Sequence, residues 1–142
     1  MPHYNSIMPQ IFPFSQATSI AFRSMVAITG SDVNLSIDMI ALVTGASRHH
    51  VAKVLQRLAK RGLISSKRGP GGGFYLKQKP EKITLLDIYE AIEGQWLLDS
   101  VKAERKRSLR HEPFNKLSDE ISSHFISFLK SHKLSAYVKE KK

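Results

Sequence analysis

The sequence predicts a mainly α-helical protein with one small β-hairpin and a long helix near its C-terminus. Three observations predict this fold. Apolar residues recur at three- and four-residue steps in several segments, which is the spacing of one face of an α-helix. A run of four glycines and one proline at positions 69–73 separates two short strand-like stretches. A further apolar stripe at helical spacing follows Pro113.

Length and composition favour a single domain and exclude several chemistries. The chain has 142 residues, of which 42% are hydrophobic, and this is enough for one core. It contains no cysteine, which excludes disulfides, thiolate-bound zinc, cysteine-held iron-sulfur clusters and thiol nucleophiles. No apolar run approaches the roughly 18 residues of a membrane span, and no basic residue precedes the apolar residues of the N-terminus. We expect a cytoplasmic protein that is not inserted in a membrane.

The positive charge is concentrated in one part of the chain. The formal net charge is +10, from 22 Lys and Arg against 12 Asp and Glu. Residues 47–82 hold ten Lys and Arg against one Glu, whereas residues 83–101 carry only acidic charges. A charge that serves solubility alone is interspersed over the surface. The block predicts a polyanionic partner, and nucleic acid is a better candidate than a membrane surface.

The chain divides into an arm, a head, a linking loop and a last helix. Residues 1–14 contain three of the six prolines, so we expect a loose arm there. Residues 15–94 form the head, residues 95–112 the loop, and residues 113–142 the long helix with a basic tail. Four head helices are predicted, each beginning at a residue that can act as an N-cap and followed by a glycine. The caps are Ser15, Ser36, Ser47 and Thr84, and the glycines are Gly30, Gly45, Gly62 and Gly94.

The third of these helices has an apolar face and a basic face. At 100° per residue, one side collects Val51, Val54, Leu55 and Leu58, and the other side collects His49, Lys53, Gln56 and Lys60, with Arg57 at its edge. His50 lies further round, and we expect it to pack against the core. Together with the helix before it and a glycine-centred turn, this pattern predicts a helix-turn-helix with this helix in the DNA major groove.

The glycine run has three interpretations. A tight hairpin turn is the simplest. A phosphate-binding catalytic loop is a poor one, because the Gly-Lys-Ser/Thr ending is absent and Phe74 begins a strand rather than a helix. A wing that touches DNA fits better, since small residues let the backbone approach the sugar-phosphate wall and Lys67 and Arg68 lie beside them.

The apolar stripe of the last helix has two interpretations, packing on its own chain and the seam of a homodimer. We expect the seam, because the head already uses its own apolar faces. Paired heads also match the two-fold symmetry of a palindromic operator. The seam residues are Phe114, Leu117, Ile121, Phe125 and Phe128.

These residues resemble the Rrf-two family of winged-helix bacterial repressors. The most specific match is Arg-Gly-Pro-Gly-Gly-Gly-Phe at 68–74, which is similar to that family's wing. Ile-Thr-Leu-Leu-Asp-Ile at 83–88 and Ala-Ile-Glu-Gly at 91–94 follow at the right distance, and the resemblance runs from about residue 14 to residue 94. It implies a winged helix-turn-helix head, a long dimerisation helix and a homodimer that represses or activates promoters.

The chain departs from the family's pattern in two places. The family's basic Lys-Gly-Arg-Tyr element is replaced by Ala-Thr-Ser-Ile at 17–20, so its phosphate contacts are either missing or supplied by Arg23 or the arm. Sensing members hold an iron-sulfur cluster with three cysteines in the loop before the long helix. Here Ser108 lies where the last cysteine is expected, and His111 where one member has a histidine ligand. Serine does not replace a thiolate and one histidine does not hold a cluster, so we predict no cofactor.

We predict a homodimeric, sequence-specific transcription regulator, most simply a repressor, that is not an enzyme. The expected DNA contacts come from the third helix and the wing: Ser47, Arg48, His49, Lys53, Gln56, Arg57, Lys60, Lys67, Arg68, Gly69, Gly71 and Gly72. By resemblance a signal would act on residues 95–111, with Ser108 and His111 as candidate effector residues. A small molecule, a partner protein, a metal at His111 or no effector at all are the alternatives there.

Two other function classes have less support from the sequence. A protein-interaction module would bind a partner through the last helix and show only weak, sequence-indifferent DNA binding. An enzyme has the least support, because no Ser/His/Asp constellation has a supporting motif and no histidine pair stands in a zinc-protease pattern. The acidic residues at 87–99 are interpreted as a solvated face of the fourth helix.

Overall fold

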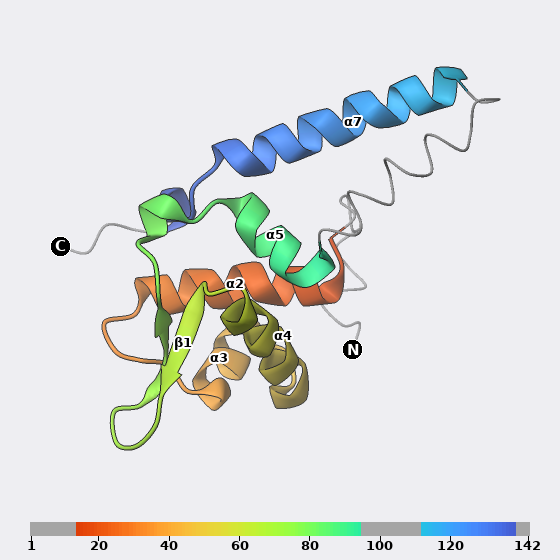
Figure 1. The fold of residues 1–142 in the computed structure, drawn as a ribbon. Coiled ribbons are helices and arrows are strands. Elements are labelled where there is room, and N and C mark those ends of the chain that lie inside the picture. The colour runs from red at the N-terminus through yellow and green to blue at the C-terminus, as the bar shows by residue number, and fades with distance from the viewer. Residues whose placement is uncertain (1–13, 95–111, 139–142) are drawn as a thin grey trace.

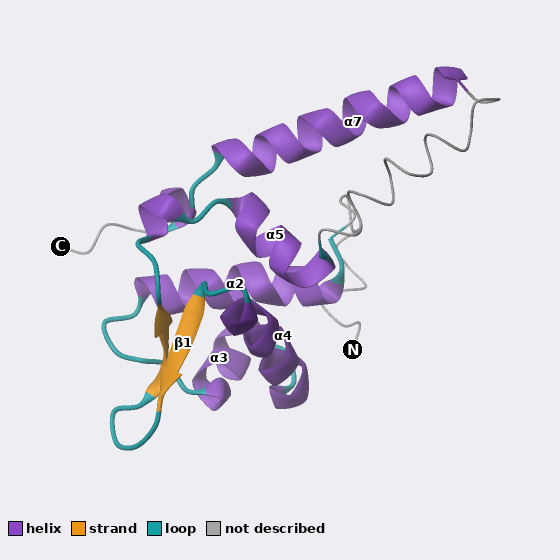
Figure 2. Ribbon diagram, viewed as in Figure 1, coloured by secondary structure: helices purple, strands orange, loops and turns teal. Residues whose placement is uncertain are grey.

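The computed structural model describes residues 14–94 and 112–138 of the chain. This part is helical apart from one short hairpin (Figure 2), as the sequence predicts. The elements in chain order are α2 (Gln16–Gly30), α3 (Ile37–Thr44), α4 (Arg48–Lys60), β1 (Ile64–Lys67), β2 (Gly73–Leu76), the 3-10 helix η1 (Pro80–Lys82), α5 (Leu85–Glu93), α7 (Glu112–Ser131) and the 3-10 helix η3 (Leu134–Tyr137).

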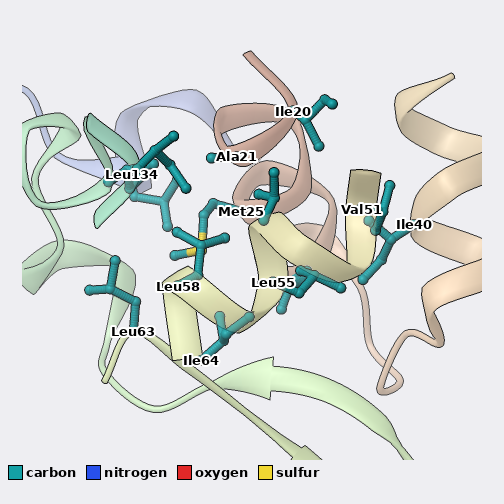
Figure 3. Packing of buried hydrophobic residues seen from close by; sticks show 14 of the residues in the cluster. Ile20, Ala21, Met25, Ile40, Val51, Leu55, Leu58, Leu63, Ile64 and Leu134 are labelled. Atoms are coloured by element: carbon teal, nitrogen blue, oxygen red, sulfur yellow. The ribbon is translucent and has the colours of Figure 1, made fainter. Parts of the chain in front are cut away.

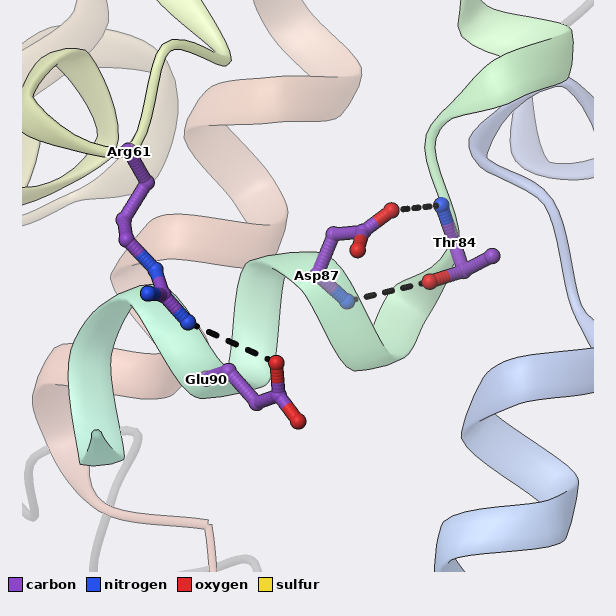
Figure 4. Close-up of polar contacts among 4 residues, drawn as sticks. All are labelled: Arg61, Thr84, Asp87 and Glu90. Carbon is purple, nitrogen blue, oxygen red and sulfur yellow. Dashed lines mark hydrogen bonds and ion pairs between the residues drawn. The ribbon is translucent and has the colours of Figure 1, made fainter. Parts of the chain in front are cut away.

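The four predicted N-caps are confirmed. The side-chain oxygens of Ser15, Ser36, Ser47 and Thr84 each accept a hydrogen bond from the backbone N–H three residues further on. At Thr84 the bond is reciprocal, because Asp87 Oδ2 accepts from the Thr84 N–H at 2.9 Å (Figure 4). Each cap satisfies a backbone donor that has no partner within its helix, and this fixes where the helices begin.

Helix α2 runs through the middle of the head. In Figure 1, α3 and α4 lie on one side of it, and α5 and α7 lie on the other. The core between them is aliphatic (Figure 3), with Met25 of α2 and Leu55 and Leu58 of α4 almost completely buried. Leu134 of η3 enters the same core, so the end of the long helix is fixed to the head.

The two strands form an antiparallel hairpin whose register runs from Ile64 opposite Leu76 to Lys67 opposite Gly73. Leu35, in the loop before α3, pairs with Phe74 of β2 and attaches the hairpin to the helix-turn-helix. At the other end of the head, the Leu134 N–H donates to the Ile83 carbonyl at 2.8 Å. These backbone contacts position the hairpin and the end of α7 independently of side-chain packing.

The apolar stripe of α7 divides between two environments. Phe125 packs on the head, with its ring centroid 5.2 Å from that of Tyr89 and 6.0 Å from that of Phe14. The sequence prediction placed Phe125 in a dimer seam, whereas within this chain its ring belongs to an aromatic cluster. Leu129 is buried as well. Four other members of the stripe are exposed: Phe114, Leu117, Ile121 and Phe128.

Candidate nucleic-acid interface

Helix α4 presents a long basic surface. Val51, Val54, Leu55 and Leu58 are buried, which confirms the apolar face predicted from the sequence. Seven polar and charged side chains of the helix are exposed: Arg48, His49, His50, Lys53, Gln56, Arg57 and Lys60. Ser47, whose Oγ caps the helix, is exposed beside them. The exposed side of α4 therefore combines cations with amide and imidazole groups that can bind base edges.

The prediction that His50 packs against the core is wrong. Its side chain is exposed and lines a cavity of about 320 Å³ between the start of α2 and α4. The other lining residues are Ser15, Gln16, Ala17, Ile20, Lys53, Val54 and Arg57. His50 follows His49 of the basic face by one residue, so its side chain points about 100° further round the helix. In that direction lies the open groove between α4 and α2 rather than the core. His50 and Lys53 thus lie next to the start of α2.

Two arginines of the basic region are engaged within the head. Arg57 Nη1 donates to the Ile92 carbonyl oxygen at 3.1 Å, and Arg61 Nη2 lies 3.4 Å from Glu90 Oε2 (Figure 4). Both contacts join α4 and its C-terminal end to α5. Arg57, one of the expected DNA contacts, is therefore also a structural residue.

Two further arginines flank the turn between α3 and α4. Arg23 Nη1 donates to the Thr44 carbonyl oxygen at 3.1 Å and so satisfies the end of α3. Arg48 Nε lies 3.6 Å from Asp38 Oδ1, with both side chains at least 70% exposed. An exposed ion pair contributes little to stability. Arg48 can therefore leave Asp38 and bind a phosphate with little loss of stability. Arg23 instead holds the end of α3 through its hydrogen bond to Thr44.

The acidic residues of α5 are not the solvated face that the sequence analysis assigned to them. Asp87 caps the helix and Glu90 pairs with Arg61. Glu93 Oε1 accepts hydrogen bonds from Ser15 Oγ at 2.6 Å and from the buried Thr18 Oγ1 at 2.7 Å. Burial, together with the Glu93 carboxylate, raises the pKa of Tyr89 above its ordinary value. The acidic side chains tie α5 to α2 and α4.

The wing turn extends beyond the last strand pair and is exposed. Lys67 and Arg68 are exposed at its start, and within the turn the Gly72 N–H donates to the Gly69 carbonyl at 2.8 Å. In Figure 1 the turn and the N-terminal end of α4 lie on the same side of the molecule, opposite α5 and α7. The structure therefore places the helix and wing predicted to touch DNA on one face.

The central basic block of the sequence does not form one surface. Lys79 precedes η1 and Lys82 is its last residue, and η1 packs against η3. In Figure 1 this region lies at the end of the hairpin away from the wing turn. The charge of residues 47–82 is thus split between the α4 and wing face and a second region at η1, because the hairpin carries the chain back across the head.

Ser108 and His111, and with them the loop at 95–111, lie outside the described residues. Within residues 14–94 and 112–138, no three His, Cys, Asp or Glu side chains are grouped so that they could hold a metal ion. Across the same ranges, none of the helices is long and apolar enough to cross a membrane.

Two residues that the sequence analysis did not single out are important for this face. Asn34 donates from Nδ2 to the Gly71 carbonyl oxygen in the wing turn at 3.3 Å, and Leu35 pairs with β2. Asn34 precedes a helix by three residues and has no periodic pattern around it. Leu35 is one of two apolar residues in this loop, and only its apolar character, shared with Val33, was available from the sequence; the structure buries Leu35 and leaves Val33 exposed.

The chain is similar to known regulators over much of its length. It is 32% identical over 102 residues to the HTH-type transcriptional regulator IscR of Xenorhabdus nematophila, covering 67% of this chain and 58% of that protein. It is 34% identical over 86 residues to IscR of Aliivibrio salmonicida, covering 56% of this chain and 50% of that protein. Across six curated relatives the matched share of their length is between 33% and 61%.

Solved structures of two regulators share the fold. Oxidised CymR of Staphylococcus aureus superposes with a TM-score of 0.74 at 20% identity, covering 92% of this chain and 99% of that one. IscR of T. potens gives a TM-score of 0.71 at 22% identity, covering 89% and 85%. The Rrf2 family, described as iron-dependent transcriptional regulators, matches residues 14–140 and confirms the resemblance to the Rrf-two family. The chain belongs to the Rrf2 family of transcriptional regulators.

Proposed function

We propose that this protein is a homodimeric, sequence-specific DNA-binding regulator that represses transcription from a palindromic operator. The observation that carries the proposal is the shared face of α4 and the wing, on which Lys53, Gln56 and Arg68 are all exposed. A helix for the major groove and a basic turn for the adjacent minor groove are the two parts that a winged reader of DNA needs.

The side chains of the face divide by chemistry into base contacts and phosphate contacts. Ser47, at the N-cap of α4, and Arg48, His49, Lys53 and Gln56 of the helix itself are assigned to base edges or the first phosphates. Gln suits adenine and Lys or Arg suits guanine. Lys60 and Lys67 neutralise phosphates, and Arg68 enters the minor groove with Gly69, Gly71 and Gly72 against the backbone. Arg57 is also assigned to a phosphate, and its Nη1 already donates to the Ile92 carbonyl oxygen in the free protein.

The homodimer is assigned to the exposed part of the α7 stripe. Phe114, Leu117, Ile121 and Phe128 repeat at three-, four- and seven-residue steps, so they share one side of the helix. A second copy with the same stripe is the simplest cover for such a face, and a two-fold axis through it would pair the heads for two half-sites.

The regulator is proposed to work without an iron-sulfur cluster, although the family is described as iron-dependent. The chain offers no cysteine thiolate. Serine oxygen does not replace a cluster thiolate, and imidazole replaces only some of the thiolates of a cluster, never all of them. The described residues also bring no three His, Asp or Glu side chains together. The residues present do not fit the group, and no step of the proposed function uses it.

The test is selection of bound fragments from genomic DNA by the purified full-length protein. We expect enrichment of one inverted-repeat sequence. If each subunit neutralises about four phosphates, the logarithm of affinity should fall against the logarithm of salt concentration with a slope near −7. Absence of any enriched sequence, or an affinity that does not depend on salt, would overturn the proposal. A stoichiometric protein partner with only weak, sequence-indifferent DNA binding would favour the interaction-module alternative.

The role of the wing is tested with Arg68→Ala and a matched control. The control is Lys79→Ala, which removes an exposed cation from the η1 region rather than from the face. Arg68→Ala should weaken binding to the selected fragment by about 1–3 kcal/mol, that is by about 5- to 150-fold, and leave the oligomeric state unchanged. Lys79→Ala should change the affinity by less than about twofold. Equal effects of the two variants would mean that the wing turn makes no specific contact.

A further inference from the structure

The wing turn is carried by a hairpin too short to hold its own position. Strands β1 and β2 pair over only four residues each, ending at Lys67 opposite Gly73. A two-stranded hairpin of this size is at best marginally stable by itself in water. Arg68 comes directly after this last pair and is exposed. Where its guanidinium group lies relative to α4 therefore depends on how the hairpin is attached to the rest of the head.

The base of the hairpin is attached through the backbone of Leu35. The Phe74 N–H donates to the Leu35 carbonyl at 2.7 Å, and the Leu35 N–H donates to the Phe74 carbonyl at 3.2 Å. Gly73 makes this approach possible, because a Cβ there would lie 2.7 Å from the Leu35 carbonyl group and its φ of 140° disfavours other residues. This attachment ends at β2 and does not reach the turn.

Asn34 reaches the turn itself. Its Nδ2 donates to the Gly71 carbonyl oxygen at 3.3 Å, beyond the last strand pair. No other side-chain hydrogen bond to residues 68–72 is found among the residues that the structure describes. The loop that carries Asn34 is itself ordered, since Ser31 Oγ donates to the Val33 carbonyl at 2.7 Å and accepts from the Val33 N–H at 3.2 Å.

We propose that Asn34 is a positioning residue for the wing, which directs Arg68 toward the minor groove in register with the major-groove contacts of α4. The inference rests on the proposed function. Asn34 stands two residues before the N-cap of α3, so its bond to Gly71 joins the turn to the helix-turn-helix directly. A turn that is already held in the free protein does not lose conformational entropy on binding. The affinity for DNA is therefore higher than it would be if the turn became ordered only in the complex.

The experiment compares Asn34→Ala with Val33→Ala on the DNA fragment that the wild-type protein selects. Val33 is the matched control, because it lies in the same loop and its side chain is exposed. One hydrogen bond of this kind corresponds to about a 2- to 10-fold loss of affinity for Asn34→Ala. Hydroxyl-radical footprinting should show the protection lost only in the minor groove beside the wing. Val33→Ala should leave both the affinity and the footprint unchanged.

A double-mutant cycle with Arg68→Ala separates positioning from general destabilisation. If Asn34 acts through the wing, Asn34→Ala should cause no further loss of affinity in the Arg68→Ala background. Additive losses, or an unchanged affinity for the single variant, would overturn the proposal. If Asn34→Ala unfolds, Asn34→Ser serves in its place, since its shorter side chain lacks the amide donor. If the wild-type protein selects no fragment, the proposed function fails first, and the two failures are thereby distinguished.

Discussion

Arg57, on the basic face of α4, donates a hydrogen bond to the carbonyl oxygen of Ile92, 3.1 Å away near the end of α5. The last carbonyls of a helix have no partner within it, and a cation there also interacts favourably with the helix dipole. Arg57, a side chain on the proposed DNA face, thus supplies a hydrogen-bond donor to the C-terminal end of α5, which lies on the opposite side of α2. Stability and DNA binding are coupled at this residue.

Replacing Arg57 with alanine should destabilise the protein, because the Ile92 carbonyl loses its charged donor. We expect a loss of about 1 kcal/mol in the free energy of unfolding, or about 4 °C in Tm. Lys53→Ala is the control. Lys53 is an exposed cation of the same helix, and it forms no ion pair within the described residues. Both variants should weaken DNA binding. Equal Tm values for the two would show that the Ile92 contact adds nothing to stability.

Replacing Ile121 with glutamate should convert the proposed dimer to monomers. Ile121 is 61% exposed in the single chain and central to the exposed stripe of α7. Burying an unpaired carboxylate in an apolar seam costs several kcal/mol, so the dimer Kd should rise by about 100-fold or more. Sedimentation equilibrium measures this change. Ser123→Glu places the same charge elsewhere on the helix and should leave the mass unchanged; dissociation by both variants would place the seam on another face.

Replacing Ser24 with alanine should stabilise the protein. The Ser24 side chain is completely buried in α2, and its hydroxyl has no hydrogen-bond partner among the described residues. An unsatisfied buried hydroxyl costs about 1 kcal/mol or more, and alanine is also the better helix former. Urea unfolding should give a higher midpoint with an unchanged slope. A lower midpoint would mean that the hydroxyl makes a stabilising bond.

The stability of the protein should fall at alkaline pH through Tyr89. Burial, and then the Glu93 carboxylate, raise the pKa of Tyr89 above 10.0 in the folded protein. Above about pH 10 the unfolded chain loses this proton while the folded chain keeps it, so stability declines as pH rises toward the folded-state pKa. Tyr89→Phe lacks this contribution. The difference in unfolding free energy between the wild-type protein and Tyr89→Phe should be constant below about pH 9. Above about pH 10 it should shift in favour of Tyr89→Phe. A difference that does not depend on pH would contradict the raised pKa of Tyr89.

Much of the proposed DNA face could be predicted because its signals are local. A Ser at an N-cap bonds to an N–H three residues away, and the basic face of α4 follows from a rotation of 100° per residue. His50 was the exception on this helix, because periodicity gives the direction of a side chain and not what lies there. The direction pointed to a groove beside α2 rather than to the core.

The sequence by itself determined the helices, their caps and the glycine turn, since each of these depends on neighbours within a few residues. It also determined the absence of thiol chemistry, because the chain has no cysteine. Only the tertiary structure decided which polar side chains pair across the head: Arg57 with Ile92, Asn34 with Gly71, and Glu93 with Ser15 and Thr18. It also separated the inward Phe125 from the exposed Ile121 of one apolar stripe. The partners in these hydrogen bonds are 35 to 78 residues apart in the chain. Their meeting depends on how whole helices pack, and no local period carries that information.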